Sequence, residues 1–161
     1  MPAHVSEHPV VTISMNLQAI LSTSRTQCAV QCNSKKRILE IISQLAAENN
    51  RDIEQETVLA ALMQRERMGS TGIGNGIAIP HGRLNGLSRV MAIVVTSEPA
   101  IDFDAIDDKP VDIFFALLVP EDQTDGHLQT LAGVAGKLAD KERVKLIRKA
   151  KTSEDIMQAL A

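Results

Sequence analysis

A histidine between a proline and a glycine is the residue of this sequence best suited to chemistry. In Pro80-His81-Gly82 the proline ring fixes the approach of the chain, and the glycine carries no side chain that could cover the imidazole. A neutral imidazole can attack phosphorus, and the resulting phosphohistidine can pass its phosphoryl group onward. His81 is therefore a candidate nucleophile, and an ordinary loop histidine or a metal ligand are the alternatives that these residues leave open.

A second histidine, His127, follows Asp125-Gly126 at the start of a predicted helix. The free N–H groups and the positive end of the dipole at a helix start favour an anion. Phosphoryl transfer depends mainly on positioning and charge neutralisation, so such a residue could support chemistry at His81 if the fold brings the two together. A solvent-exposed residue is the simpler alternative for His127.

The glycines before His81 invite a comparison with nucleotide-binding loops, and their spacing excludes it. In Gly72-x-Gly74-x-Gly76 the dinucleotide fingerprint would need another glycine where Ile77 stands, and the Gly-Lys-Ser/Thr of a P-loop is absent. The glycines instead indicate positive φ angles and backbone that passes close to another element or a partner.

A metal-dependent hydrolase is a further alternative, with His81 and His127 joined by Asp125 or Asp122. This spacing matches no recognised ligand pattern, so we rank the metal site last. No cofactor and no metal are expected.

Composition restricts the classes of partner. With 17 basic and 20 acidic residues the formal net charge is −3, which gives no electrostatic reason to expect nucleic acid or an anionic membrane. Cys28 and Cys32 lack the C-x-x-C spacing of redox and zinc sites, and we interpret them as small apolar residues. The sequence has neither a secretory leader nor an apolar run long enough to span a bilayer, so we expect a cytoplasmic protein with no membrane segment.

Hydrophobic periodicity divides the chain into helices and strands behind a short polar lead-in. Residues 1–12 are polar and interrupted by prolines, as in a flexible N-terminal lead-in, and residues 13–161 are expected to form one domain. The predicted helices cover about 34–49, 54–68, 125–138 and 141–150, with a last one from 153, and the predicted strands cover about 27–32, 77–79, 90–96 and 112–119. The last two strands are apolar at nearly every position, which predicts an α/β or α+β domain with helices on both faces of one sheet.

The segment 65–82 resembles the active-site motif of enzyme IIA domains of the bacterial phosphotransferase system, mannitol/fructose class (EIIA type 2). It reads Arg-Glu-Arg-Met-Gly-Ser-Thr-Gly-Ile-Gly-Asn-Gly-Ile-Ala-Ile-Pro-His-Gly. The resemblance is greater to the nitrogen-regulatory branch, and the stretches Pro99–Asp107 and Val111–Gln123 strengthen it. It extends from about Asn16 to the C-terminus, and it implies a three-layer α/β sandwich whose mixed sheet of about five strands has helices on both faces.

The resemblance also assigns roles to individual residues. It implies that His81 accepts phosphate on Nε2, as tele-phosphohistidine, from a histidine phosphocarrier protein (HPr/NPr-like). It implies that His127 supports this histidine and that Arg65 neutralises phosphate or contacts the carrier, with Arg67 and Arg83 as weaker candidates for the same role.

The function implied is that of a cytoplasmic phosphocarrier whose phosphorylation state regulates partner proteins, such as a potassium transporter or a sensor kinase. It would act through a phosphohistidine intermediate rather than by turnover of a small substrate. Two alternatives remain open: a sugar-specific enzyme IIA that passes phosphate to an enzyme IIB, and a binding regulator that works without phosphorylation of His81.

Overall fold

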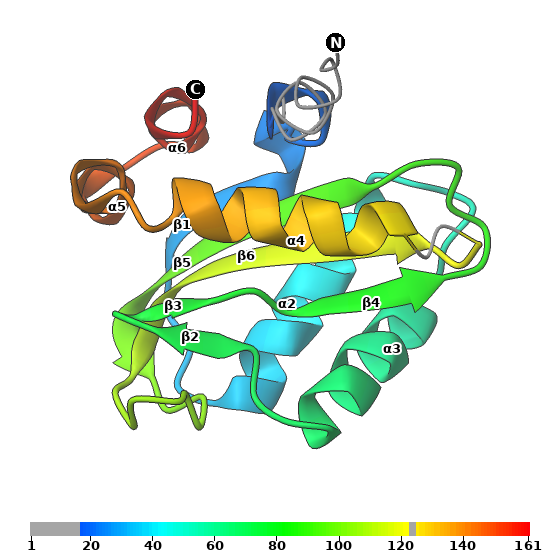
Figure 1. Ribbon diagram of the computed structural model, residues 1–161, viewed down its shortest axis with the longest axis horizontal. Coiled ribbons are helices and arrows are strands. Elements are labelled where there is room, and N and C mark those ends of the chain that lie inside the picture. Colours follow the sequence, from blue (N-terminus) through cyan, green and yellow to red (C-terminus); the bar gives the residue numbers. More distant parts are fainter. Residues whose placement is uncertain (1–16, 123–124) are drawn as a thin grey trace, which may run out of the picture.

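A six-stranded mixed sheet forms the middle layer of the computed structural model (Figure 1). The structure describes residues 17–122 and 125–161, and for residues 125–127 it describes the backbone only. The lead-in expected over residues 1–12 lies outside the described residues. The strands are β1 (Thr26–Val30), β2 (Gly72–Gly74), β3 (Ile77–Ala78), β4 (His81–Leu84), β5 (Met91–Ile101) and β6 (Val111–Pro120).

Strands β3 and β4 follow one another along the same edge of β6. The sheet order is β1-β5-β6-β3-β2, and β4 also pairs with β6. Strands β3 and β4 run parallel to β6, β1 runs parallel to β5, and the pairs β5–β6 and β2–β3 are antiparallel. The mixed sheet therefore agrees with the expected architecture and has six strands rather than about five. Neither β2 nor β4 had a strand pattern of its own, because both are short and rich in glycine or polar residues.

Five α-helices of the described residues cover the two faces of this sheet. They are α2 (Lys35–Glu48), α3 (Gln55–Arg67), α4 (Asp125–Lys137), α5 (Lys141–Lys149) and α6 (Ser153–Ala159), preceded by the short 3-10 turns η2 (Leu17–Ala19) and η3 (Thr23–Arg25). The helix predicted from about residue 34 is confirmed, and Ser34 caps it, since its side chain accepts a hydrogen bond from the Arg37 amide. None of the helices within the described ranges is long and apolar enough to cross a membrane.

Alternating side chains of the two long strands supply two separate hydrophobic cores. Phe114, Ala116 and Leu118 of β6 pack with α2 and α3, whereas Phe115 and Leu117 of the same strand pack with α4, α5 and α6. This alternation places helices on both faces, as Figure 1 shows. The helices that the apolar strand runs predicted on both faces of one sheet are confirmed, and so is the three-layer sandwich that the resemblance implied.

The glycine-rich stretch forms a β-hairpin. Gly74 of β2 pairs with Ile77 of β3, so the loop contains two residues, Asn75 and Gly76, with φ angles of 59° and 78°. Positive φ at both positions defines a type I′ turn, for which Asn-Gly is a preferred sequence. At Gly72 an added Cβ would lie 2.7 Å from the Cβ of Ala105. The sequence-based prediction of positive φ angles and close backbone contact is therefore confirmed.

Candidate functional site

His81 is the first residue of β4, at the break between the two short strands that share the edge of β6. It pairs with Leu117, and the Leu117 amide donates a hydrogen bond of 2.9 Å to the carbonyl oxygen of Pro80. This pairing fixes the backbone immediately before the imidazole. His81 is half-buried, so it is less exposed than an open loop residue would be.

The glycine after His81 has a packing role that the sequence did not indicate. Gly82 is buried, and a Cβ on it would lie only 3.0 Å from the Cβ of Ala61 on α3. Strand alternation points this position toward the layer of α2 and α3, away from the side on which the His81 ring lies. Gly82 therefore allows α3 to approach β4 closely, and the expectation that it leaves the ring uncovered stays a prediction.

The two ring nitrogens of His81 have partners of opposite kinds. Nδ1 lies 2.8 Å from the carbonyl oxygen of Ile79, which can only accept a hydrogen bond. Nε2 lies 3.2 Å from Nε of Arg65, which can only donate one. Both contacts are satisfied by the tautomer that carries its proton on Nδ1. The ring lone pair that accepts from Arg65, and with it the nucleophilic character of the ring, is then on Nε2.

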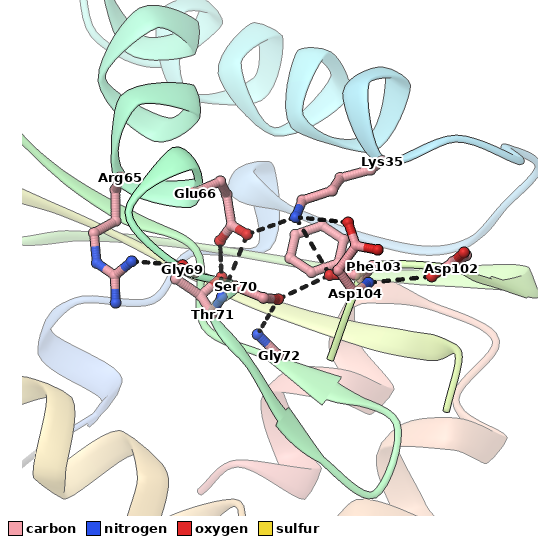
Figure 2. A network of polar contacts seen from close by, with 10 residues as sticks. All are labelled: Lys35, Arg65, Glu66, Gly69, Ser70, Thr71, Gly72, Asp102, Phe103 and Asp104. Carbon is pink, nitrogen blue, oxygen red and sulfur yellow. Dashed lines mark hydrogen bonds and ion pairs between the residues drawn. The ribbon is translucent and has the colours of Figure 1, made fainter. Parts of the chain in front are cut away.

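Arg65 approaches His81 from the last turn of α3. Val58 and Leu62 face the core from this helix, and Arg65 lies beside that buried stripe, half-exposed. Its Nη1 donates a hydrogen bond of 2.7 Å to the Gly69 carbonyl oxygen, which holds the guanidinium against the turn (Figure 2). A permanent positive charge therefore lies beside the nucleophilic nitrogen, where it could neutralise an anionic group.

His127 lies in the first turn of α4, and its side chain is outside the described part of the structure. Strands β4 and β6 are parallel and end side by side, where Leu84 pairs with Pro120. Helix α4 follows β6 and packs back across the sheet face through Val134 and Leu138. The backbone of α4 thus starts near the end of β4, and contact between the two imidazoles stays a prediction.

Arg67 and Arg83, the weaker candidates, are both exposed, and neither forms an ion pair with a described residue. Arg83 is two residues beyond His81 on β4, so both side chains lie on the same side of the strand. Their contribution to the site stays a prediction.

Metal chemistry gains no support from the described side chains, which contain no group of three or more His, Cys, Asp or Glu residues able to hold a metal ion. The side chains of Asp125 and His127 fall outside that set. Cys28 and Cys32 are free thiols, the first half-buried and the second buried. Burial, followed by the nearby Asp155 carboxylate, raises the pKa of the Cys28 thiol.

Three further residues around the site were not predicted. Glu66 is buried next to Arg65, where its carboxylate meets Lys35 and Thr71. For Glu66, one sequence signal could have indicated burial, namely its spacing. Val58, Leu62 and Glu66 recur every fourth residue along the buried face of α3. A glutamate continuing an apolar stripe indicates a buried carboxylate with a dedicated partner.

Comparisons with known proteins identify the family of the chain. The family model described as "Phosphoenolpyruvate-dependent sugar phosphotransferase system, EIIA 2" matches residues 19–161. The nitrogen regulatory protein of Escherichia coli K12 is 49% identical over 148 residues, which cover 91% of this chain and 90% of that protein.

Two solved structures give the same result at the level of the fold. The crystal structure of nitrogen regulatory protein IIA-Ntr from Neisseria meningitidis superposes with a TM-score of 0.84 at 34% identity, covering 90% of this chain and 99% of that one. Enzyme IIA for mannitol from Escherichia coli, in its complex with phosphorylated enzyme IIB, has a TM-score of 0.73 at 15% identity, with coverage of 87% and 96%. At that identity the second match supports the fold alone.

Proposed function

This chain belongs to the EIIA type 2 family of the phosphoenolpyruvate-dependent sugar phosphotransferase system, in its nitrogen-regulatory branch, and we propose that it accepts a phosphoryl group on His81 and regulates partners accordingly. The observation that carries the proposal is the pair of contacts at the ring. The Ile79 carbonyl oxygen holds a proton on Nδ1 of His81, which leaves Nε2 as the nucleophile.

The proposed transfer balances without a cofactor. The Nε2 lone pair of His81 forms the new P–N bond while the P–N bond of the donor phosphohistidine breaks, and that electron pair returns to the donor imidazole. The Nδ1 proton of His81 stays on the ring, hydrogen-bonded to the Ile79 carbonyl oxygen. The phosphoryl group keeps its charge throughout, so the protein has to supply mainly alignment and positive charge.

Arg65 supplies that charge in the proposed mechanism. In the unphosphorylated chain its Nε donates to the lone pair of Nε2, so this hydrogen bond must break when the incoming phosphorus takes the lone pair. The guanidinium then lies beside the phosphoryl oxygens, which it can bind through two N–H groups. His127, on the first turn of α4, is proposed to contribute a second donor.

The proposed donor is a histidine phosphocarrier protein of the HPr/NPr type, since membership of the enzyme IIA family implies a phosphotransfer partner of this kind. The identity of 49% to a nitrogen regulatory protein supports a regulatory output through partner proteins, for which a potassium transporter and a sensor kinase are the proposed classes. A cytoplasmic location is proposed with this role, and the free thiols of Cys28 and Cys32 are compatible with a reducing compartment.

The test is phosphorylation of the purified chain by phosphoenolpyruvate, enzyme I and the carrier, followed by intact-protein mass spectrometry. The wild-type chain should gain one phosphoryl group, and His81→Ala should gain none. His4→Ala is the matched control, because it removes a histidine of the predicted lead-in and should leave acceptance unchanged.

Acceptance by His81→Ala at the wild-type rate would show that the acceptor is misassigned. A second assay separates the regulatory from the sugar-specific role: rapid transfer from the phosphorylated chain to a mannitol or fructose enzyme IIB would contradict the regulatory assignment. A glutamate or alanine at position 81 that left every partner interaction unchanged would favour the binding regulator that needs no phosphate.

A further inference from the structure

A buried carboxylate belongs to the residue next to Arg65, which contacts the candidate acceptor His81. The side chain of Glu66, on the last turn of α3, is only 5% exposed and accepts three hydrogen bonds or ion pairs. The Thr71 amide donates to it at 3.1 Å, the Thr71 hydroxyl makes a short hydrogen bond to the same oxygen, and Nζ of Lys35 lies 2.9 Å from the other oxygen (Figure 2). A carboxylate so placed fixes Thr71 relative to α3.

Lys35 neutralises this carboxylate and ties it to a further loop. Its ammonium group donates to the carbonyl oxygen of Phe103 at 3.3 Å and lies 4.5 Å from the centre of the Phe103 ring. The Ser70 hydroxyl donates to the same carbonyl oxygen at 2.8 Å. Figure 2 shows the start of α2, the end of α3, residues 69–72 and the loop at 102–104 converging on this network. Because these hydrogen bonds surround the Lys35–Glu66 ion pair, they hold both side chains in one arrangement.

From Thr71 the contacts lead to the Nδ1 side of His81. The Thr71 carbonyl oxygen accepts a hydrogen bond of 3.0 Å from the Ile79 amide. The Ile79 carbonyl oxygen in turn accepts from Nδ1 of His81 at 2.8 Å. The group that fixes the tautomer of the acceptor is thus two hydrogen bonds from the Glu66 carboxylate.

From Glu66 the contacts also lead to the Nε2 side of His81, because the next residue back along α3 is Arg65. The Arg65 guanidinium donates to Nε2 of His81 at 3.2 Å and to the Gly69 carbonyl oxygen at 2.7 Å. The turn is closed by the Gly69 amide, which donates to the carbonyl oxygen of Glu66 at 3.1 Å. These contacts therefore form a closed ring, which passes through Glu66, Thr71, Ile79, His81 and Arg65.

We propose that Glu66 is a positioning residue for phosphoryl transfer: through Thr71 and Ile79 it fixes the Nδ1–H tautomer of His81, and through the last turn of α3 it holds Arg65 at Nε2. It touches neither the imidazole nor the phosphoryl group. The rate consequence rests on the proposed function, whereas the effect on the tautomer does not.

The test is Glu66→Gln, which keeps the shape of the side chain but replaces one acceptor oxygen by an NH₂ donor. The amide and hydroxyl of Thr71 and the ammonium group of Lys35 all donate to the Glu66 carboxylate. In the variant, the NH₂ group of glutamine would face one of these donors and could not accept its hydrogen bond. In the unphosphorylated variant, ¹⁵N NMR of the His81 ring should show the Nε2–H tautomer rising at the expense of Nδ1–H. The maximal rate of transfer from the carrier should fall by about 10-fold or more, with an unchanged KM for the carrier.

Glu40→Gln is the matched control, because it removes the same charge from an exposed ion pair with Arg37, and it should leave both readouts at wild-type values. Thr71→Val tests the link without disturbing the Glu66–Lys35 ion pair, and it also serves if Glu66→Gln does not fold. It should shift the tautomer in the same direction, whereas Thr71→Ser, which keeps the hydroxyl, should restore the wild-type ratio.

A folded Glu66→Gln or Thr71→Val chain with the wild-type tautomer ratio would overturn the proposal. The NMR measurement needs no phosphate donor. If His81→Ala were still phosphorylated, the proposed function would fail while the tautomer result would stand, so the two failures are distinguishable.

Discussion

At His81, the hydrogen-bond partners of the two ring nitrogens determine which nitrogen carries the proton and which carries the lone pair. An acceptor at Nδ1, the Ile79 carbonyl oxygen, and a donor at Nε2, the Arg65 guanidinium, select one tautomer of a neutral imidazole. In the proposed transfer, the nucleophile is therefore prepared before any phosphate arrives, and Arg65 already places a cation beside it.

Arg65 gives the first prediction at this scale. Arg65→Ala should lower the rate of phosphoryl transfer to His81 by about 100-fold, because the charge beside Nε2 is lost. Arg65→Lys should recover only part of the rate. The compact ammonium group of lysine cannot contact His81 and the Gly69 carbonyl oxygen at the same time, as the planar guanidinium of arginine does.

Single-turnover transfer from the phosphorylated carrier measures this effect. Arg37→Ala is the control, because it removes an arginine from an exposed ion pair with Glu40 on α2, whereas Arg65 lies on α3. Equal rates for Arg65→Ala and Arg37→Ala would show that Arg65 is an ordinary surface charge.

Some of this site could be predicted from residue types and some could not. His81 stands out because its flanking residues are unusual, and the Arg65 contact was expected only through the family resemblance, since sixteen residues separate the two side chains. The partner of Nδ1 is a backbone carbonyl, which leaves no trace in the sequence. Glu66 resembles any helix-surface glutamate until the burial of the surrounding stripe is known.

At the scale of elements, the contact between α3 and β4 determines how far Arg65 is from His81. Gly82 lies at this contact, where its missing side chain leaves room for Ala61. The two residues that meet at Nε2 are thus carried by two elements packed directly against one another.

Gly82→Ala should push these elements apart. Because the new Cβ would lie 3.0 Å from the Cβ of Ala61, we expect a loss of about 1–3 kcal/mol in the free energy of unfolding, together with slower phosphoryl transfer. Denaturant unfolding and the transfer assay measure the two effects.

Gly136→Ala is the control for this substitution, because an added Cβ there meets no atom within 4 Å. It lies in α4, where alanine is favoured over glycine, so its stability should equal or exceed the wild type by up to about 1 kcal/mol. Equal stability of Gly82→Ala and wild type would contradict the account of the α3–β4 contact.

The turn of the β2–β3 hairpin gives a prediction about pH. The Asn75 amide, followed by the Lys109 amide, donates to the Asp107 carboxylate and lowers its pKa. Because the folded pKa is below the unfolded one, the stabilisation is present above the unfolded value of about 3.9 and is lost as the pH falls through the lowered value.

The Asn75 amide resonance should therefore titrate with a midpoint below that of an ordinary aspartate, and Asp107→Asn should abolish the transition. Asp108→Asn, at the neighbouring exposed position, should retain it. A midpoint at or above the ordinary value in the wild-type chain would contradict the hydrogen bond.

The elements also show where sequence patterns are sufficient. Helices α2 and α3 were predicted because apolar residues recur at helical spacing, and strands β5 and β6 because each contains a continuous apolar run. Strands β2 and β4 were not, because their pairing is determined by β3 and β6 rather than by their own residues.

At the scale of the whole molecule, one sheet with a core on each face supports the site. Phe114 and Phe115 are consecutive residues of β6 that are fully buried in opposite cores. The start of β4 lies between α3 on one side and the layer of α4 on the other, so elements on both faces position His81. With a net charge of only −3, the proposed binding of a phosphoryl group would depend on local cations rather than on the field of the molecule.

The most direct measurement of the central claim is NMR of the phosphorylated chain with ¹⁵N-labelled histidine, which identifies the nitrogen bonded to phosphorus. The phosphoryl group should be on Nε2 of His81, with Nδ1 still protonated and hydrogen-bonded to the Ile79 carbonyl oxygen. Phosphate on Nδ1 of His81, or on any other residue, would contradict the account.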